Sequence, residues 1–79
     1  MYFVYILQSI NDPKRFYVGL TTDLEKRLGQ HNNGESIHTN KFKPWKYRTV
    51  IRFDDVQKAE AFERYLKSGS GRAFSKKHF

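Results

Sequence analysis

The chain has 79 residues, a formal net charge of +7 and no cysteine. A chain of this length buries only about 60% of the surface that it exposes when unfolded, which predicts a single domain over residues 1–79 with a small core. Without cysteine there is no disulfide framework and no thiolate site for structural zinc. No apolar run approaches the roughly 20 residues of a membrane span and no signal-peptide pattern is present, so we expect a cytoplasmic protein with no membrane partner.

The positive charge indicates a polyanionic partner, with nucleic acid expected before an anionic membrane. The stretches from His38 to Arg52 and from Arg64 to Phe79 each hold five Lys or Arg and no acidic residue. Charged stretches are often only solvated faces, and composition alone leaves that reading open. The cations expected to contact phosphates are Lys41, Lys43, Lys46, Arg48, Arg72, Lys76 and Lys77.

The N-terminal part of the chain predicts a β-hairpin. Tyr2 to Leu7 is an unbroken run of aromatic and aliphatic residues, which is typical of a strand buried on both faces. A turn cluster follows, and Phe16 to Leu20 then alternates, with Tyr17 and Gly19 on one face. Because Gly19 has no side chain, we expect that face of the hairpin to be open.

A helix is predicted after the hairpin. Thr22 and Glu25 have the spacing of a capping box, in which each side chain bonds to a free amide of the first turn. Leu24, Leu28 and His31 follow at helical spacing, and the run Asn32 to Gly34 predicts the end of the helix.

The second half of the chain predicts a loop, a strand and one or two helices. Glu35 to Pro44 is polar and predicts a loop, and Trp45 to Phe53 is rich in β-forming residues. Apolar residues recur every three or four positions from Val56 to Leu66, which predicts a helix that ends near Ser68, followed by a short basic helix or tail. The predicted fold is α+β: a three-stranded antiparallel sheet flanked by helices, in the order β-β-α-β-α-α.

Three polar residues lie on apolar faces of the predicted helices. Glu63 falls between Ala59 and Leu66, where a carboxylate needs an ion pair, hydrogen bonds or a metal ion. Arg27 and His31 are four residues apart and lean toward the sheet. Each has an ordinary structural explanation: a salt bridge for Glu63, a side chain reaching water for Arg27, and a satisfied core imidazole for His31.

Tyr5 and Tyr17 lie on neighbouring predicted strands, so their hydroxyl groups are expected to converge beside Gly19. Aromatic residues on strands usually belong to the core. Combined with Arg27, His31 and Glu63, however, they supply what phosphodiester hydrolysis needs: a metal-binding carboxylate, a guanidinium for the transition state and polar hydroxyls.

These residues resemble the motifs of the GIY-YIG nuclease family, in its small single-domain bacterial branch. Phe3-Val4-Tyr5 is similar to the first half-motif and Tyr17-Val18-Gly19 to the second, while Arg27, His31 and Glu63 follow in the family's order. The first motif departs from the family at Phe3, which replaces a glycine. The asparagine that some members carry after the glutamate is also missing, and Tyr65 stands at that turn.

The resemblance implies a divalent-metal-dependent endonuclease with Mg²⁺ or Mn²⁺ at Glu63. It further implies that Arg27 binds the phosphate, that Tyr17 acts as or positions the general base, and that Tyr5 and His31 complete the hydrogen-bond network. Since an ordinary tyrosine has a pKa near 10, the base role requires help from the metal or nearby cations.

The expected substrate is DNA rather than RNA, in repair or recombination, and a protein partner is left open. Two other functions remain compatible with the sequence. One is a non-catalytic nucleic-acid-binding module with the same fold, and the other is an interaction protein whose basic surface meets an acidic partner.

Overall fold

The computed structural model describes all 79 residues and confirms the predicted α+β fold. Three strands form one antiparallel sheet in the order β2-β1-β3. The elements in chain order are β1 (Tyr2–Ser9), β2 (Phe16–Thr21), α1 (Leu24–Asn32), the 3₁₀ helix η1 (Asn40–Phe42), β3 (Trp45–Phe53), α2 (Val56–Lys67) and α3 (Gly69–His78). None of the helices combines the length and the apolar composition needed to cross a membrane.

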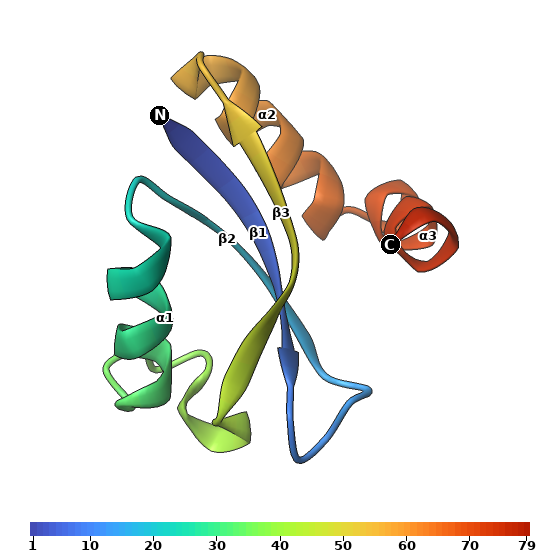
Figure 1. Ribbon diagram of the computed structural model, residues 1–79. Coiled ribbons are helices and arrows are strands. Elements are labelled where there is room, and N and C mark those ends of the chain that lie inside the picture. Colours follow the sequence, from blue (N-terminus) through green and yellow to red (C-terminus); the bar gives the residue numbers. More distant parts are fainter.

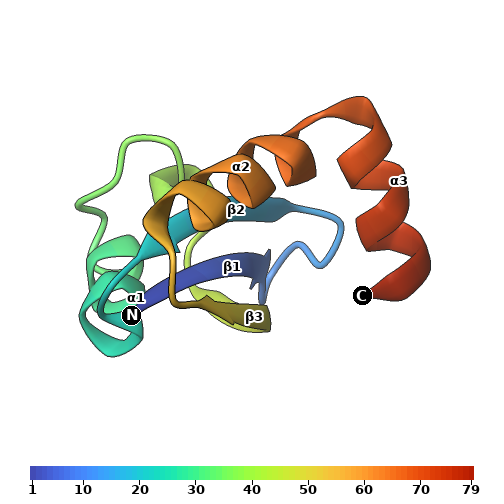
Figure 2. The same cartoon turned by 90° about the horizontal axis from the view of Figure 1, so that it is seen from above.

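The sheet lies between two layers of helix (Figure 1). Alternation along β1 sends Val4 and Ile6 toward α2, where they pack with Ala59 and Leu66. The intervening residues, Tyr5 and Leu7, face α1 and pack with Trp45, Leu24 and Leu28. In the view from above, α2 runs along one side of the sheet and α3 lies beyond its end (Figure 2). The central strand β1 therefore contributes to both cores, as its unbroken apolar run predicts.

A β-bulge in β3 changes which of its side chains face each core. Ile6 pairs with Thr49 whereas Leu7 pairs with Tyr47, so Arg48 is the extra residue. Tyr47 consequently packs on the α1 side of the sheet and Phe53 on the α2 side. Without the bulge, strict alternation along β3 would place residues 47 and 53 on the same face. A bulge depends on pairing with another strand, so the composition of β3 alone does not predict it.

The cap of α1 differs from the capping box predicted at Thr22 and Glu25. Asp23 is the N-cap, with its Oδ1 accepting from the Lys26 amide at 3.0 Å, and the Asp23 amide in turn donates to Thr21 Oγ1. Both Thr22 and Glu25 are exposed. Aspartate supplies a charged acceptor at the positive end of the helix, which favours it over threonine as the cap.

The segment predicted as a loop, Glu35 to Pro44, contains η1 and contributes to the α1 core. Phe42 packs against that core, and the Trp45 indole Nε1 donates to Thr39 O at 2.8 Å. Asn32, the last residue of α1, accepts from the Trp45 amide and donates to its carbonyl. These bonds hold the segment against α1 and bring Thr39 close to His31.

Candidate active site

The hydroxyl of Tyr5 is the centre of a polar cluster between β1 and α1. Arg27 Nε donates to this oxygen at 3.2 Å, and His31 Nε2 lies 2.9 Å from it. Arg27 and His31 come from successive turns of α1, and the i, i+4 spacing directs both toward the sheet. Tyr5 is only 1% exposed, and burial raises the pKa of its phenol. Tyr5 therefore stays protonated and serves to orient its two neighbours.

His31 is fully buried, with a partner for each ring nitrogen. Its Nδ1 lies 2.7 Å from Thr39 Oγ1. Because Arg27 can only donate, we assign the Tyr5 hydroxyl as the donor to its other partner, His31 Nε2, and place the imidazole proton on Nδ1, which donates to Thr39 Oγ1. Burial, and secondly the charge of Arg27, lowers the pKa of His31 to about 4. At neutral pH His31 is thus an uncharged acceptor that holds the Tyr5 hydroxyl.

The low pKa of His31 predicts an acid-sensitive fold. The unfolded chain takes up a proton near pH 6.5 but the folded chain only near pH 4, so the contribution to stability is complete above pH 6.5 and is lost as the pH falls toward 4. Between pH 8 and pH 4.5 the protonation of His31 lowers the free energy of unfolding by at most about 2.5 kcal/mol. Urea unfolding across this range should show the loss in the wild type and in His38→Gln, which changes an exposed histidine, but not in His31→Gln. Equal pH slopes in all three proteins would contradict the assignment.

Gly19 makes room for the Tyr5 ring. Tyr5 and Gly19 are direct cross-strand partners, and a Cβ at position 19 would collide with the Tyr5 hydroxyl and ring. The space expected to be open beside Gly19 is therefore filled by Tyr5, and Gly19 itself is buried. The glycine of the second half-motif is required because any side chain would displace the phenol at the centre of the cluster.

Tyr17 lies at the outer side of this cluster and is partly exposed. Its ring meets the His31 ring edge-on with 5.3 Å between centroids. The hydrogen bond from Arg27 to Tyr5, assisted by the nearby Tyr17, raises the pKa of Arg27. Tyr47 closes the inner side: its hydroxyl donates to Leu24 O, and burial raises its pKa to about 12. Of the three tyrosines, Tyr17 is therefore the one placed to meet a substrate.

Glu63 lies on α2, in the other helical layer, and its negative charge adds to burial in raising the pKa of Tyr5. Its side chain is 21% exposed and forms an ion pair with Lys67, with 3.3 Å between Oε2 and Nζ. Lys67 Nζ also lies 5.9 Å from the centroid of the Tyr17 ring. The salt bridge considered for Glu63 is therefore present, and it joins the carboxylate to the tyrosine at the β2 edge. The i, i+4 spacing of Glu63 and Lys67 already indicates such a pair.

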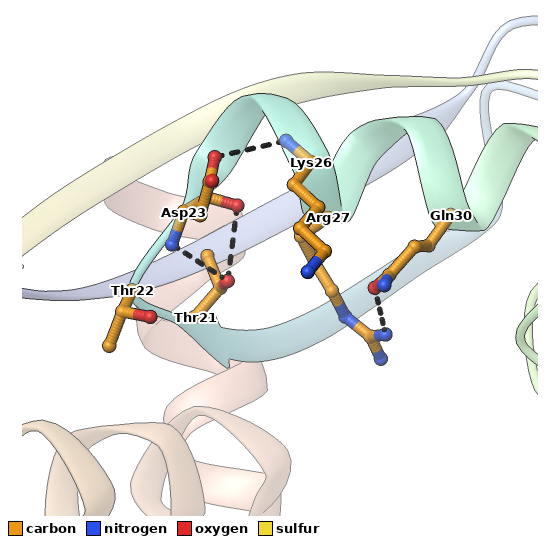
Figure 3. A pocket seen from close by; sticks show the side chains of 6 residues that line it. All are labelled: Thr21, Thr22, Asp23, Lys26, Arg27 and Gln30. Carbon is orange, nitrogen blue, oxygen red and sulfur yellow. Dashed lines mark hydrogen bonds between the residues drawn. The ribbon is translucent and has the colours of Figure 1, made fainter.

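A polar pocket of about 350 Å³ borders Arg27 at the start of α1 (Figure 3). The residues that line it are Thr21, Thr22, Asp23, Lys26, Arg27 and Gln30. Arg27 Nη1 donates to Gln30 Oε1 at 2.9 Å. The guanidinium is thus oriented by Tyr5 and Gln30 and keeps donors for an anion. Gln30 and Thr39 were not foreseen as supporting residues, because neither stands out in the sequence.

The carboxylate available here suits an ion that keeps water and phosphate ligands, such as Mg²⁺ or Mn²⁺, better than an ion whose ligands all come from the protein. No group of three or more His, Asp or Glu side chains could enclose a metal ion. Mg²⁺ is commonly held by one or two carboxylates together with water and substrate phosphates, and Glu63 is a partly exposed carboxylate of this kind. Lys67 pairs with one oxygen of this carboxylate, Oε2, and would compete with a metal ion for it.

The seven cations predicted to contact nucleic acid lie in different places. Arg48, Arg72 and Lys76 line one groove, described below, and Lys77 is exposed on α3. The other three lie outside that groove: Lys41 is above the Phe42 ring, Lys43 donates to Asn40, and Lys46 is exposed on β3. The two basic stretches of the sequence are therefore only partly separated in space. Arg48, from the stretch His38 to Arg52, lies in the same groove as Arg72 and Lys76, from the stretch Arg64 to Phe79.

The sheet order, the two half-motif strands and the polar cluster define a known class. The family model described as "GIY-YIG catalytic domain" matches residues 1–77, and the chain belongs to this family. This confirms the family resemblance predicted from the sequence, while the roles of the individual site residues stay predictions.

The chain is similar to small bacterial proteins and to parts of larger fungal ones. It is 32% identical over 77 residues to a UPF0213 protein of Cupriavidus necator, covering 92% of this chain and 82% of the relative. It is 42% identical over 67 residues to the UPF0213 protein YsiG of Lactococcus lactis, covering 84% of this chain and 62% of the relative. It is 38% identical over 73 residues to "Structure-specific endonuclease subunit SLX1" of Debaryomyces hansenii, covering 84% of this chain but only 21% of the relative.

Proposed function

We propose that this protein is a divalent-metal-dependent endonuclease that hydrolyses phosphodiester bonds in DNA. The observation that carries the proposal is the Tyr5 hydroxyl bonded to Arg27 and His31, beside Tyr17 and within reach of Glu63 through Lys67. Membership of the GIY-YIG family and similarity to proteins named as endonuclease subunits support it. Because those relatives are named as subunits, we also propose a protein partner, and we propose repair or recombination as the context of cleavage.

In this proposal each residue has a separate role. Arg27 binds the scissile phosphate and stabilises the charge that develops in the transition state, because Tyr5 and Gln30 hold its guanidinium in place. Tyr17 accepts or directs the proton of the attacking water, with Lys67 and Arg27 supplying positive charge nearby. Glu63 would hold Mg²⁺ or Mn²⁺, which when bound neutralises phosphate charge.

One observation favours a second function, a nucleic-acid-binding module that does not cleave. Glu63 is already paired with Lys67, and a carboxylate that keeps this pair has no need of a metal ion. In that case the positive charge of the protein would bind phosphates in the same salt-dependent way with or without divalent metal.

The two functions are separated by incubating the wild-type protein with end-labelled duplex, branched and single-stranded DNA, and with matching RNA, in Mg²⁺, Mn²⁺ or EDTA. The nuclease proposal predicts cleavage of DNA in either metal and none in EDTA, with salt-sensitive binding in all three. Tight binding without cleavage of any substrate would favour the binding module instead.

A further inference from the structure

A basic groove of about 940 Å³ opens between α3, the β1–β2 connection and β3. Both α3 and that connection lie on the right of the molecule in Figures 1 and 2. Its cationic residues are Lys14, Arg15, Arg48, Lys67, Arg72 and Lys76, and no acidic side chain lines it. Arg15 pairs with Asp12 and Lys67 with Glu63, while the other four have no acidic partner. Such a groove is complementary to a chain of phosphates.

The floor of the groove is apolar and carries an exposed aromatic ring. Val18 and Leu66 line it, and the Phe16 side chain stands in it with Phe16 52% exposed. The Arg48 guanidinium lies 5.8 Å from the centroid of the Phe16 ring. An exposed ring flanked by cations is the arrangement on which unpaired bases stack, with phosphates held alongside.

We propose that this groove binds single-stranded nucleic acid, with a base stacked on Phe16 and phosphates on Arg48, Arg72 and Lys76. A duplex would gain little from Phe16, because the faces of its bases are already covered by their neighbours. An unpaired strand offers a free base face to the ring and its backbone to the cations. The proposal rests on the proposed function in one respect, namely that nucleic acid is the substrate.

The groove is continuous with the candidate active site. Tyr17 and Lys67 line the groove, and the same two residues contact His31 and Glu63. Phe16 and Tyr17 are successive residues of β2, so their side chains leave opposite faces of the strand at one edge of the sheet. Both side chains nevertheless line the groove, because β2 is an edge strand, so a nucleic-acid strand stacked on Phe16 passes beside Tyr17 and is delivered to the site.

Binding is measured by fluorescence anisotropy in EDTA, with a labelled twelve-nucleotide oligothymidine and a hairpin duplex of equal charge. We expect Phe16→Ala and Phe16→Leu to weaken single-strand binding by about 5- to 100-fold, Phe16→Tyr to restore it, and duplex binding to change less than twofold. Arg72→Ala should weaken single-strand binding and flatten its salt dependence, whereas Lys58→Ala, which removes an exposed cation of α2 outside the groove, should match the wild type. Thermal melting checks that the half-exposed Phe16 variants remain folded.

Unchanged single-strand binding in both Phe16→Ala and Phe16→Leu would overturn the inference, as would equal losses for single strand and duplex. Binding of acidic protein or anionic vesicles with no binding of oligonucleotide would also overturn it. Cleavage is scored separately in Mn²⁺. Single-strand binding that depends on Phe16, without cleavage, would support the groove proposal and contradict the nuclease proposal. Cleavage accompanied by single-strand binding that does not depend on Phe16 would support the nuclease proposal and contradict the groove proposal.

Discussion

Glu63→Gln is expected to lower the rate of metal-dependent cleavage by about 100- to 1000-fold without weakening DNA binding in EDTA. The substitution keeps the shape of the side chain but removes the charge on which the proposed metal binding depends. The fold should survive, because the partly exposed ion pair with Lys67 contributes at most about 1 kcal/mol. Single-turnover cleavage in Mn²⁺ and anisotropy in EDTA measure the two effects.

Glu60→Gln is the matched control for this prediction. Glu60 lies on the same helix, is exposed and forms no ion pair, so its substitution removes one negative charge without touching the site. Its cleavage rate should stay close to that of the wild type. If Glu63→Gln cleaves as fast as Glu60→Gln, Glu63 is not the metal ligand.

Arg27→Ala is expected to reduce kcat/KM for cleavage by about 100- to 1000-fold, the range found when a positioned transition-state donor is removed. The change also removes the donor to the Tyr5 hydroxyl, so the buried phenol loses one of its two partners. Arg27→Lys should recover only part of the rate, because one ammonium group cannot bond Tyr5 and Gln30 and still contact a phosphate.

Lys26→Ala is the control for Arg27, since it removes a neighbouring exposed cation from the same pocket. It should weaken DNA binding slightly and leave the cleavage rate of bound DNA unchanged. The assigned role of Arg27 would be wrong if both substitutions reduced kcat/KM equally. Melting temperatures of both variants show whether a loss of activity reflects unfolding.

Much of the fold was predictable because its local patterns are strong. Strand β1 extends two residues beyond the predicted run that ends at Leu7, and β3 and α2 end within a residue of the predicted limits. The basic tail forms α3, which Ser68 starts by accepting from the Gly71 amide. The cap of α1 was mistaken because Thr22 and Asp23 are both good caps, and the choice depends on backbone angles.

The candidate site was only partly predictable. The converging side chains of Tyr5, Arg27 and His31 follow from strand alternation and helical spacing, and the structure brings them together. Thr39, the second partner of His31, comes from a segment held by Trp45, and no local pattern indicates that contact. The basic groove was also beyond local prediction, because its walls come from segments far apart in the chain.

The proposed function depends most directly on Glu63 binding the metal ion required for cleavage, in competition with Lys67. Electron paramagnetic resonance can follow free Mn²⁺ during a titration with wild type, Glu63→Gln and Lys67→Met, each with a cleavage-resistant phosphorothioate DNA. We predict that the wild type binds Mn²⁺, that Lys67→Met binds it more tightly because the competing ammonium is gone, and that Glu63→Gln adds nothing to the binding by DNA alone. Equal Mn²⁺ binding by wild type and Glu63→Gln would contradict the claim.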